Sequence, residues 1–277
     1  MNIDALPYTA YLLLSELAVG SLAVLLFADA RGLVERSFVK YCAAQTAAIA
    51  ALTLPLAWWS AGGEIASGYP VRASGFEAGW WLLIGFFVLA AAYAALTFGA
   101  ARRAEMVTGA VGVALGFAAL ASIAYALSEP VWSYAAMLVS AFLGALATGG
   151  VTLAMVLGHW YLVTPRLPNR PLNELTLVAL AALLAQAALM ALNLAMPAGE
   201  TIDVTTVFGE GLAANPALWL RAGVGLAFAG ACVAMAHLSS RESSMMSATG
   251  LLYIAMGAVL AGEVLARGVL FATAVPV

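Results

Sequence analysis

The sequence predicts an all-α, polytopic membrane protein with eight transmembrane helices. Only 9% of the 277 residues are charged, 64% are hydrophobic, and the mean hydropathy is +1.00. A water-soluble domain has roughly 25% charged residues. Apolar runs of about 20 residues, the length that crosses a bilayer core, fill nearly the whole chain. We therefore expect residues 1–277 to form a single integral-membrane domain, with no loop long enough for a separate catalytic domain.

Charged or Pro/Gly-rich segments separate the apolar runs. The expected spans are 7–28, 41–59, 79–100, 106–127, 133–163, 175–197, 217–239 and 248–272. Asp4 precedes the first span without a basic residue, unlike the start of a cleavable signal peptide, so this span is expected to be retained. Pro55 can kink the second span, although a packing role is favoured. Gly112 and Gly116 let the fourth span approach a neighbour closely.

The fifth span is longer than a bilayer requires, so it is expected to tilt or to end in the interface. Trp160 and Tyr161, near its end, favour that depth. The sixth span contains Asn193, the seventh begins near Arg221, and the eighth contains Glu263. We expect the eight helices to form two four-helix bundles.

The basic residues predict the orientation, because loops on the cytoplasmic side carry the excess of Lys and Arg. One set of loop ends holds Arg31, Arg36, Lys40, Arg102, Arg103, Arg166, Arg170 and Arg241, and the other holds only Arg72. Both termini are therefore expected on the outer side. The loops 60–78 and 198–216 would form an acidic outer surface. Its acidic residues are Glu64, Glu77, Glu200, Asp203 and Glu210.

Several classes of function are excluded by composition. Cys42 and Cys232 both lie in apolar runs, so they form neither a disulfide framework nor a CxxC metal or iron–sulfur motif. Eleven basic residues stand against fourteen acidic ones and form no patch, which excludes nucleic-acid binding.

Charged residues inside the spans are the candidate functional residues, because each costs at least about 2.5 kcal/mol in a bilayer. Counting from the outer ends of the spans, Glu16 and Glu263 lie roughly 13 Å deep, and Arg221 and Arg267 roughly 6–7 Å deep. Glu263 and Arg267 are four residues apart and share a helix face. Asn193 has the depth of the arginines. We expect these side chains to line a pocket beneath the outer surface.

A plainer interpretation is that these charges serve only structure. Glu263 and Arg267 would neutralise each other, while Arg221 would extend to the outer interface. Glu16 would make a hydrogen bond between helices in its protonated form.

The two histidines, His159 and His237, lie toward the inner ends of the fifth and seventh spans. Such a pair could hold one b-type haem, but polar interfacial histidines are the favoured interpretation, and no metal site is expected. Gln45, Asp29 and Arg31 have similar depth and could form a hydrogen-bonded inner network.

The run Ala261–Phe271 resembles the final helix of the membrane anchors of the dimethyl-sulfoxide-reductase and polysulfide-reductase type, called NrfD-like. In those anchors a Gly-Glu pair is followed one helical turn later by Arg, as Gly262, Glu263 and Arg267 are here. Leu218–Arg221 resembles the Trp-and-Arg stretch that begins the corresponding seventh helix. The Gly149–Gly150 pair is a weaker similarity. Ala266 departs from the pattern, since the anchors commonly have Gly there.

The resemblance implies a quinone-reactive subunit of a respiratory oxidoreductase in a bacterial-type inner (plasma) membrane. It would carry no haem, would hold menaquinone or ubiquinone near the outer side, and would exchange electrons with an iron–sulfur subunit and, through it, a catalytic subunit. Quinol oxidation releases protons, so Glu263 and Glu16 would be the catalytic carboxylates. The expected quinone-binding residues are Arg267, Arg221 and Asn193.

Two other functions remain open. Buried Glu and Arg residues are equally typical of a proton- or ion-coupled transporter. The other alternative is a non-catalytic structural subunit of a respiratory complex. It predicts that the outer charges pair among themselves and enclose no cavity.

Overall fold

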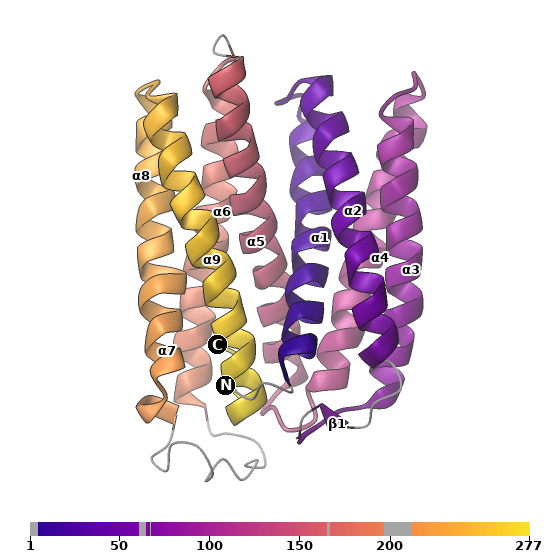
Figure 1. The fold of residues 1–277 in the computed structure, drawn as a ribbon, viewed down its shortest axis with the longest axis vertical. Coiled ribbons are helices and arrows are strands. Elements are labelled where there is room, and N and C mark those ends of the chain that lie inside the picture. Colours follow the sequence, from indigo (N-terminus) through magenta and orange to yellow (C-terminus); the bar gives the residue numbers. More distant parts are fainter. Residues whose placement is uncertain (1–4, 61–64, 67, 165–166, 197–211) are drawn as a thin grey trace.

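The computed structural model describes residues 5–60, 65–66, 68–164, 167–196 and 212–277. In these residues the chain forms long helices that run roughly parallel to one another (Figure 1). The long helices are α1 (Leu6–Ala30), α2 (Arg36–Ser60), α3 (Ala73–Leu96), α4 (Arg102–Leu127), α5 (Tyr134–Val163), α6 (Arg170–Ala195), α8 (Ala229–Arg241) and α9 (Met245–Thr273). The short elements are β1 (Ile65–Ala66), β2 (Tyr69–Pro70), η2 (Leu212–Ala214), α7 (Pro216–Leu220) and the π-helix η3 (Arg221–Phe228).

Eight helical segments of the described chain are long and apolar enough to cross a membrane. One of them is the continuous run Pro216–Arg241, which α7, η3 and α8 form together. Each segment overlaps one predicted span, so the prediction of an all-helical chain with eight membrane-spanning helices is confirmed. The fold is that of a multi-pass membrane protein.

The helices extend beyond several predicted spans because a helix does not have to end where the bilayer does. The sixth begins at Arg170 rather than at 175, and its first turn is stabilised by the i,i+4 pair of Arg170 and Glu174, with Nε and Oε1 2.8 Å apart. The third begins at Ala73 rather than at 79. Glu77, predicted in a loop, is therefore an exposed residue of α3.

Large apolar side chains cover the outside of the long helices. Leu52, Val107, Leu184 and Leu238 are each more than half exposed. A water-soluble protein rarely exposes so many large apolar side chains, whereas lipid tails are an equally apolar solvent. The surface therefore agrees with the spans in indicating a membrane environment.

In Figure 1, α1 to α4 lie on one side of the molecule and α5 to α9 on the other, with α1 beside α5 at the centre. Two glycines allow this central contact. A Cβ atom on Gly20 of α1 would overlap the backbone carbonyl of Ala145, and one on Gly149 of α5 would overlap the backbone of Gly20 and Ser21. Small residues at such crossings let helix backbones approach closely in a membrane.

The described ends of the chain lie at the same end of the molecule (Figure 1). Arg72, which precedes α3, also belongs to this end, whereas the other described loop-end arginines belong to the opposite end. Arg166 lies outside the described residues, as do the predicted outer acidic residues Glu64, Glu200, Asp203 and Glu210.

A charged cluster joins the helices at the end opposite the termini. The carboxylates of Asp29 and Glu105 are buried, and the guanidinium groups of Arg36 and Arg102 are less than half exposed. Arg36 Nη1 lies 2.7 Å from Glu105 Oε1, and Arg102 Nη1 lies 2.6 Å from Asp29 Oδ2. Tyr93 donates its hydroxyl to Asp29 at 3.0 Å. The cluster ties α1, α2, α3 and α4 together.

This cluster differs from the inner network predicted from depth. Asp29 belongs to it, but Arg31 instead pairs with Glu174, with Nε and Oε2 2.9 Å apart. Gln45 Oε1 has no hydrogen-bond partner in the described part of the chain. Equal depth therefore failed to identify the partners, because it says nothing about which way a side chain faces.

Candidate functional site

The four charged residues predicted inside the spans come together in one place. Glu16 lies on α1, Arg221 is the first residue of η3, and Glu263 and Arg267 lie on α9; each is at most 1% exposed. Arg221 Nη2 is 3.1 Å from Glu263 Oε1, and Glu263 Oε2 is 3.3 Å from Arg267 Nη2. Arg267 Nη2 also pairs with Glu16 Oε1. We call these four residues the charge chain.

Two neutral side chains extend the charge chain to further helices. Gln186 of α6 donates Nε2–H to Glu263 Oε1 at 2.7 Å, and Arg267 Nη1 donates to Ser140 Oγ of α5 at 3.3 Å. The sequence interpretation missed both. Gln186 could have been found, because an amide in the middle of an apolar span is costly unless it has a partner. Ser140 gives no comparable signal.

Glycines make room for the charged side chains. A Cβ atom on Gly144 of α5 would lie 2.9 Å from both Arg267 Nη2 and Glu16 Oε2. A Cβ atom on Gly262 would lie 3.0 Å from Arg221 Nη1. Both contacts are tighter than ordinary van der Waals packing, so the charge chain occupies space that alanine would fill.

The charge chain contains two cations and two anions, so its formal charges balance. A buried charge must be paired, since an uncompensated one costs several kcal/mol. Several of its polar atoms nevertheless have no hydrogen-bond partner among the described residues: Glu16 Oε2, Arg221 Nε, Arg221 Nη1, Arg267 Nε and Gln186 Oε1. Unpartnered buried groups of this kind are uncommon. A water or a hydroxyl group beside them could accept from the arginine nitrogens and donate to the two oxygens.

Asn193 does not join the charge chain. Its Oδ1 accepts a hydrogen bond from Trp132 Nε1 at 3.2 Å, and its Nδ2 donates to the carbonyl of Pro276. The side chain thus fastens the segment before α5 and the segment after α9 to the end of α6. Its predicted place beside the arginines rested on depth alone.

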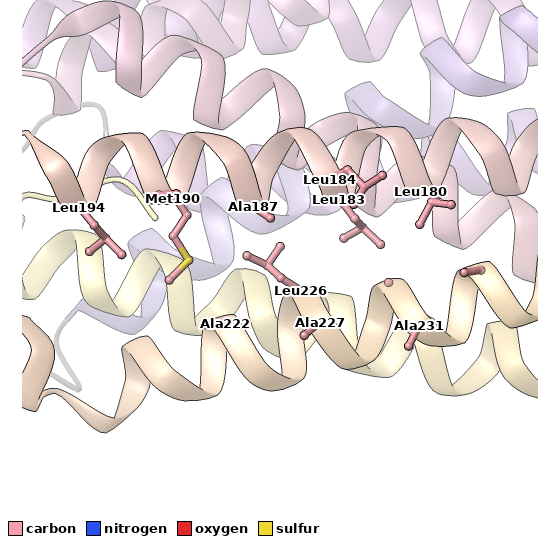
Figure 2. A pocket seen from close by; sticks show the side chains of 13 residues that line it. Leu180, Leu183, Leu184, Ala187, Met190, Leu194, Ala222, Leu226, Ala227 and Ala231 are labelled. Carbon is pink, nitrogen blue, oxygen red and sulfur yellow. The ribbon is translucent and has the colours of Figure 1, made fainter.

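An apolar groove runs between α6 and the η3–α8 segment, with a volume of about 590 Å³. In Figure 2 the leucines and Met190 of α6 face Leu226 and the alanines of the opposite helix. Its lining extends from Leu180 to Leu194 on α6, about 21 Å at the rise of an α-helix. We call it the alanine groove. Ala187 and Ala222, in its wall, directly follow Gln186 and Arg221 in the chain.

A second groove of about 460 Å³ lies among α2, α5 and α9, toward the end opposite the termini. Tyr41, His159, Trp160 and Tyr253 contribute its ring-bearing side chains. We call it the aromatic groove. None of the charge-chain residues lines the alanine groove or the aromatic groove. The expectation that the four charges line a pocket is therefore not met at these grooves, because the charges pair with one another instead.

The two histidines have different partners. His159 Nδ1 lies 3.1 Å from the hydroxyl of Tyr253, and His237 Nδ1 lies 3.0 Å from the hydroxyl of Thr176. Each histidine therefore belongs to a different helix pair. Within the described residues, no group of three or more His, Cys, Asp or Glu side chains is placed to hold a metal ion.

The fold and the charge chain define a multi-pass helical membrane protein with a neutralised ionic network inside it. No protein-family model, no curated protein and no solved structure matches the chain. The resemblance to the NrfD-like anchors therefore rests on the sequence alone.

Proposed function

We propose that this chain is the quinone- or quinol-reactive membrane subunit of a multi-subunit respiratory oxidoreductase. The observation that carries the proposal is a buried charge chain with unpartnered polar atoms, close in sequence to the wall of an apolar groove. The subunit would exchange electrons with an iron–sulfur partner, which would connect it to a catalytic subunit. By the positive-inside rule, both termini and the charge chain would lie toward the outer side of a bacterial-type plasma membrane.

Quinol oxidation releases protons together with electrons, so its site needs a proton acceptor and a donor that holds the quinone oxygen. Glu263 is the proposed proton acceptor, and Glu16 would pass the proton outward. Arg221 can contact both Glu263 and the quinone oxygen. Its Nη2 holds Glu263, while Nε and Nη1 have no partner in the described chain. Arg267 would keep the two carboxylates apart and oriented.

The alanine groove supports the binding part of the proposal. Small-molecule sites are mostly apolar clefts with a few polar groups, and a volume of about 590 Å³ lies in their usual range. Its length suits an isoprenoid tail that enters from the lipid. The small side chains of Ala187 and Ala222 would let a flat head group approach Arg221 and the Glu263 carboxylate that Gln186 holds.

The test is the variant Glu263→Gln in the complex purified under mild detergent. We expect oxidation of a short-chain quinol, coupled to an artificial acceptor, to fall roughly 100-fold, as for loss of a general base. An iron–sulfur protein should still copurify. Glu77→Gln, an exposed carboxylate of α3, is the matched control and should oxidise quinol at the unmodified rate. Unchanged turnover in Glu263→Gln would remove the catalytic role of Glu263, and the lack of any iron–sulfur partner would remove the redox proposal.

A structural subunit without chemistry is the second candidate, and one observation favours it: the four charges pair among themselves. The quadruple variant Glu16→Gln, Arg221→Met, Glu263→Gln, Arg267→Met distinguishes the two candidate functions. It removes all four charges of the charge chain and so leaves no buried charge unpaired. A structural subunit would keep the complex assembled and its quinone-linked turnover intact. A quinone-reactive subunit would lose turnover while the complex still assembles.

A further inference from the structure

We infer that the aromatic groove is a second binding site for a quinone-type head group, at the opposite end of the molecule from the charge chain. This inference rests on the proposed function. It concerns side chains that the charge chain does not use, and the groove lies on different helices. A subunit with both sites would meet the quinone pool from either leaflet.

The aromatic groove has the form of a ring-binding site. Three helices contribute to it: Tyr41 comes from α2, His159 from α5 and Tyr253 from α9. The Trp160 ring forms part of the wall and packs edge-on against Phe38, with ring centroids 5.7 Å apart. A wall fixed in this way offers a flat apolar surface to an aromatic ligand.

The polar groups of the groove suit a ligand whose oxygens alternate between carbonyl and hydroxyl. The Tyr253 hydroxyl and His159 Nδ1 lie 3.1 Å apart, which leaves the other ring nitrogen of His159 for a ligand. Imidazole and phenol can each donate or accept a hydrogen bond. The same side chains can therefore hold the oxidised and the reduced form of a quinone.

Charge argues for a neutral ring and against a phospholipid head group. The seven described residues that line the groove include no Lys or Arg. A phosphate there would be without the cation with which phosphates form their strong hydrogen bonds. A quinone ring carries no charge in either stable form and needs none.

The position of the groove allows entry from the lipid. Tyr41 and Tyr253 lie within the first eight residues after the starts of α2 and α9, and His159 lies four residues before the end of α5. At the rise of an α-helix these positions are about 6–12 Å below the helix ends. Tyr41 and Tyr253 are 54% and 46% exposed, so the groove opens sideways rather than into the protein core.

Photolabelling with a short-chain azidoquinone tests the inference, using the full chain in nanodiscs of neutral phosphatidylcholine. We expect label on the 155–163 segment or on Tyr253. Tyr253→Phe, which removes one hydroxyl, and His159→Leu should each reduce that label about tenfold, the effect of one lost hydrogen bond. His237→Leu removes the other histidine and is the matched control, with unchanged label expected.

Three results would overturn the inference: label confined to the alanine groove, equal label in the unmodified protein and Tyr253→Phe, or displacement of the azidoquinone by added anionic phospholipid. Thermal unfolding of each variant shows that the groove is intact. Copurification of an iron–sulfur protein and the effect of Glu263→Gln do not depend on the aromatic groove. If the photolabelling test fails while copurification and the effect of Glu263→Gln are as expected, the proposed function is therefore retained.

Discussion

Gly225 of η3 and Gly262 of α9 meet where these two helices cross, and a Cβ atom on Gly225 would lie 2.6 Å from the Cα atom of Gly262. Glu263 follows Gly262 directly, and Arg221 lies four residues before Gly225. The crossing therefore brings Arg221 to Glu263. Close helix packing and the ionic contact are two results of the same pair of glycines.

Alanine at either of these glycines should destabilise the protein. For Gly225→Ala and Gly262→Ala we expect losses of about 1–3 kcal/mol, as for overpacking, because the added methyl group meets backbone that cannot move aside. Thermal unfolding in detergent is the measurement. Gly223→Ala and Gly257→Ala are the matched controls, since no atom lies within 4 Å of the added Cβ. Equal losses at all four positions would show that the crossing is looser than described.

Removing one member of the charge chain should destabilise the protein more than removing an oppositely charged pair. Arg267→Met leaves Glu16 without its ionic partner, so we expect a loss of about 3–5 kcal/mol. Adding Glu16→Gln should restore part of this stability, because the orphaned charge is removed. A double-mutant cycle by chemical unfolding gives the coupling energy. Additive effects would contradict the pairing of Arg267 with Glu16.

Gln186 should matter for the position of Glu263. Gln186→Leu keeps the volume of the side chain and removes a hydrogen bond to a buried carboxylate, for which we expect about 1–2 kcal/mol of destabilisation. Quinol oxidation should fall as well, with kcat affected more than KM if Gln186 orients Glu263 without touching quinone. A change in KM alone would instead place Gln186 in contact with the ligand.

Tyr69 should give the protein part of its sensitivity to alkali. It lies between the second and third spans, and its hydroxyl donates to the carbonyl of Leu127 at 2.7 Å. Burial raises the pKa of the Tyr69 phenol above its ordinary value of about 10. The unfolded chain therefore loses this proton first, and stability should fall as pH rises above about 10.

Tyr69→Phe should be less stable than the unmodified protein near neutral pH, by about 0.5–1.5 kcal/mol. The difference should shrink between about pH 9 and about pH 11, because phenylalanine has no proton to lose. Thermal unfolding across this range measures it. Tyr134→Phe, at an exposed tyrosine, is the control. A difference that is independent of pH would mean that the Tyr69 phenol is not buried.

The sequence was sufficient for the spans because hydropathy measures the property that the bilayer selects. It could not identify the continuation of α3 and α6 beyond the apolar runs, which depends on helix capping and on pairs such as Arg170 with Glu174. The π-helical turns of η3 were also missed. Apart from Arg221 and two glycines, Gly223 and Gly225, nothing in the segment Arg221–Phe228 distinguishes it from an ordinary span.

For the site, the cost of burying charge was a reliable guide and depth was a poor one. Each of the four intramembrane charges belongs to the charge chain, because a buried charge must find a partner. Asn193 shares their depth and faces other groups. Gln186, which does contact Glu263, could have been selected by the same cost argument. The charges pair with one another instead of lining the alanine groove or the aromatic groove. This depends on the direction of each side chain, which the spacing of residues in the sequence does not give.

The π-helical segment gives the seventh span more residues between α7 and α8 than a regular α-helix would need there. An α-helix turns by about 100° per residue, and a π-helix holds an extra residue in each turn. Deleting one residue between Gly223 and Phe228 would let the segment close toward an ordinary α-helix, so Arg221 would largely keep its direction relative to α8. Deleting one residue from the α-helical part after Phe228 would instead turn Arg221 by about 100° relative to the end of α8. Arg221 would then point away from Glu263 without any change in the charges themselves.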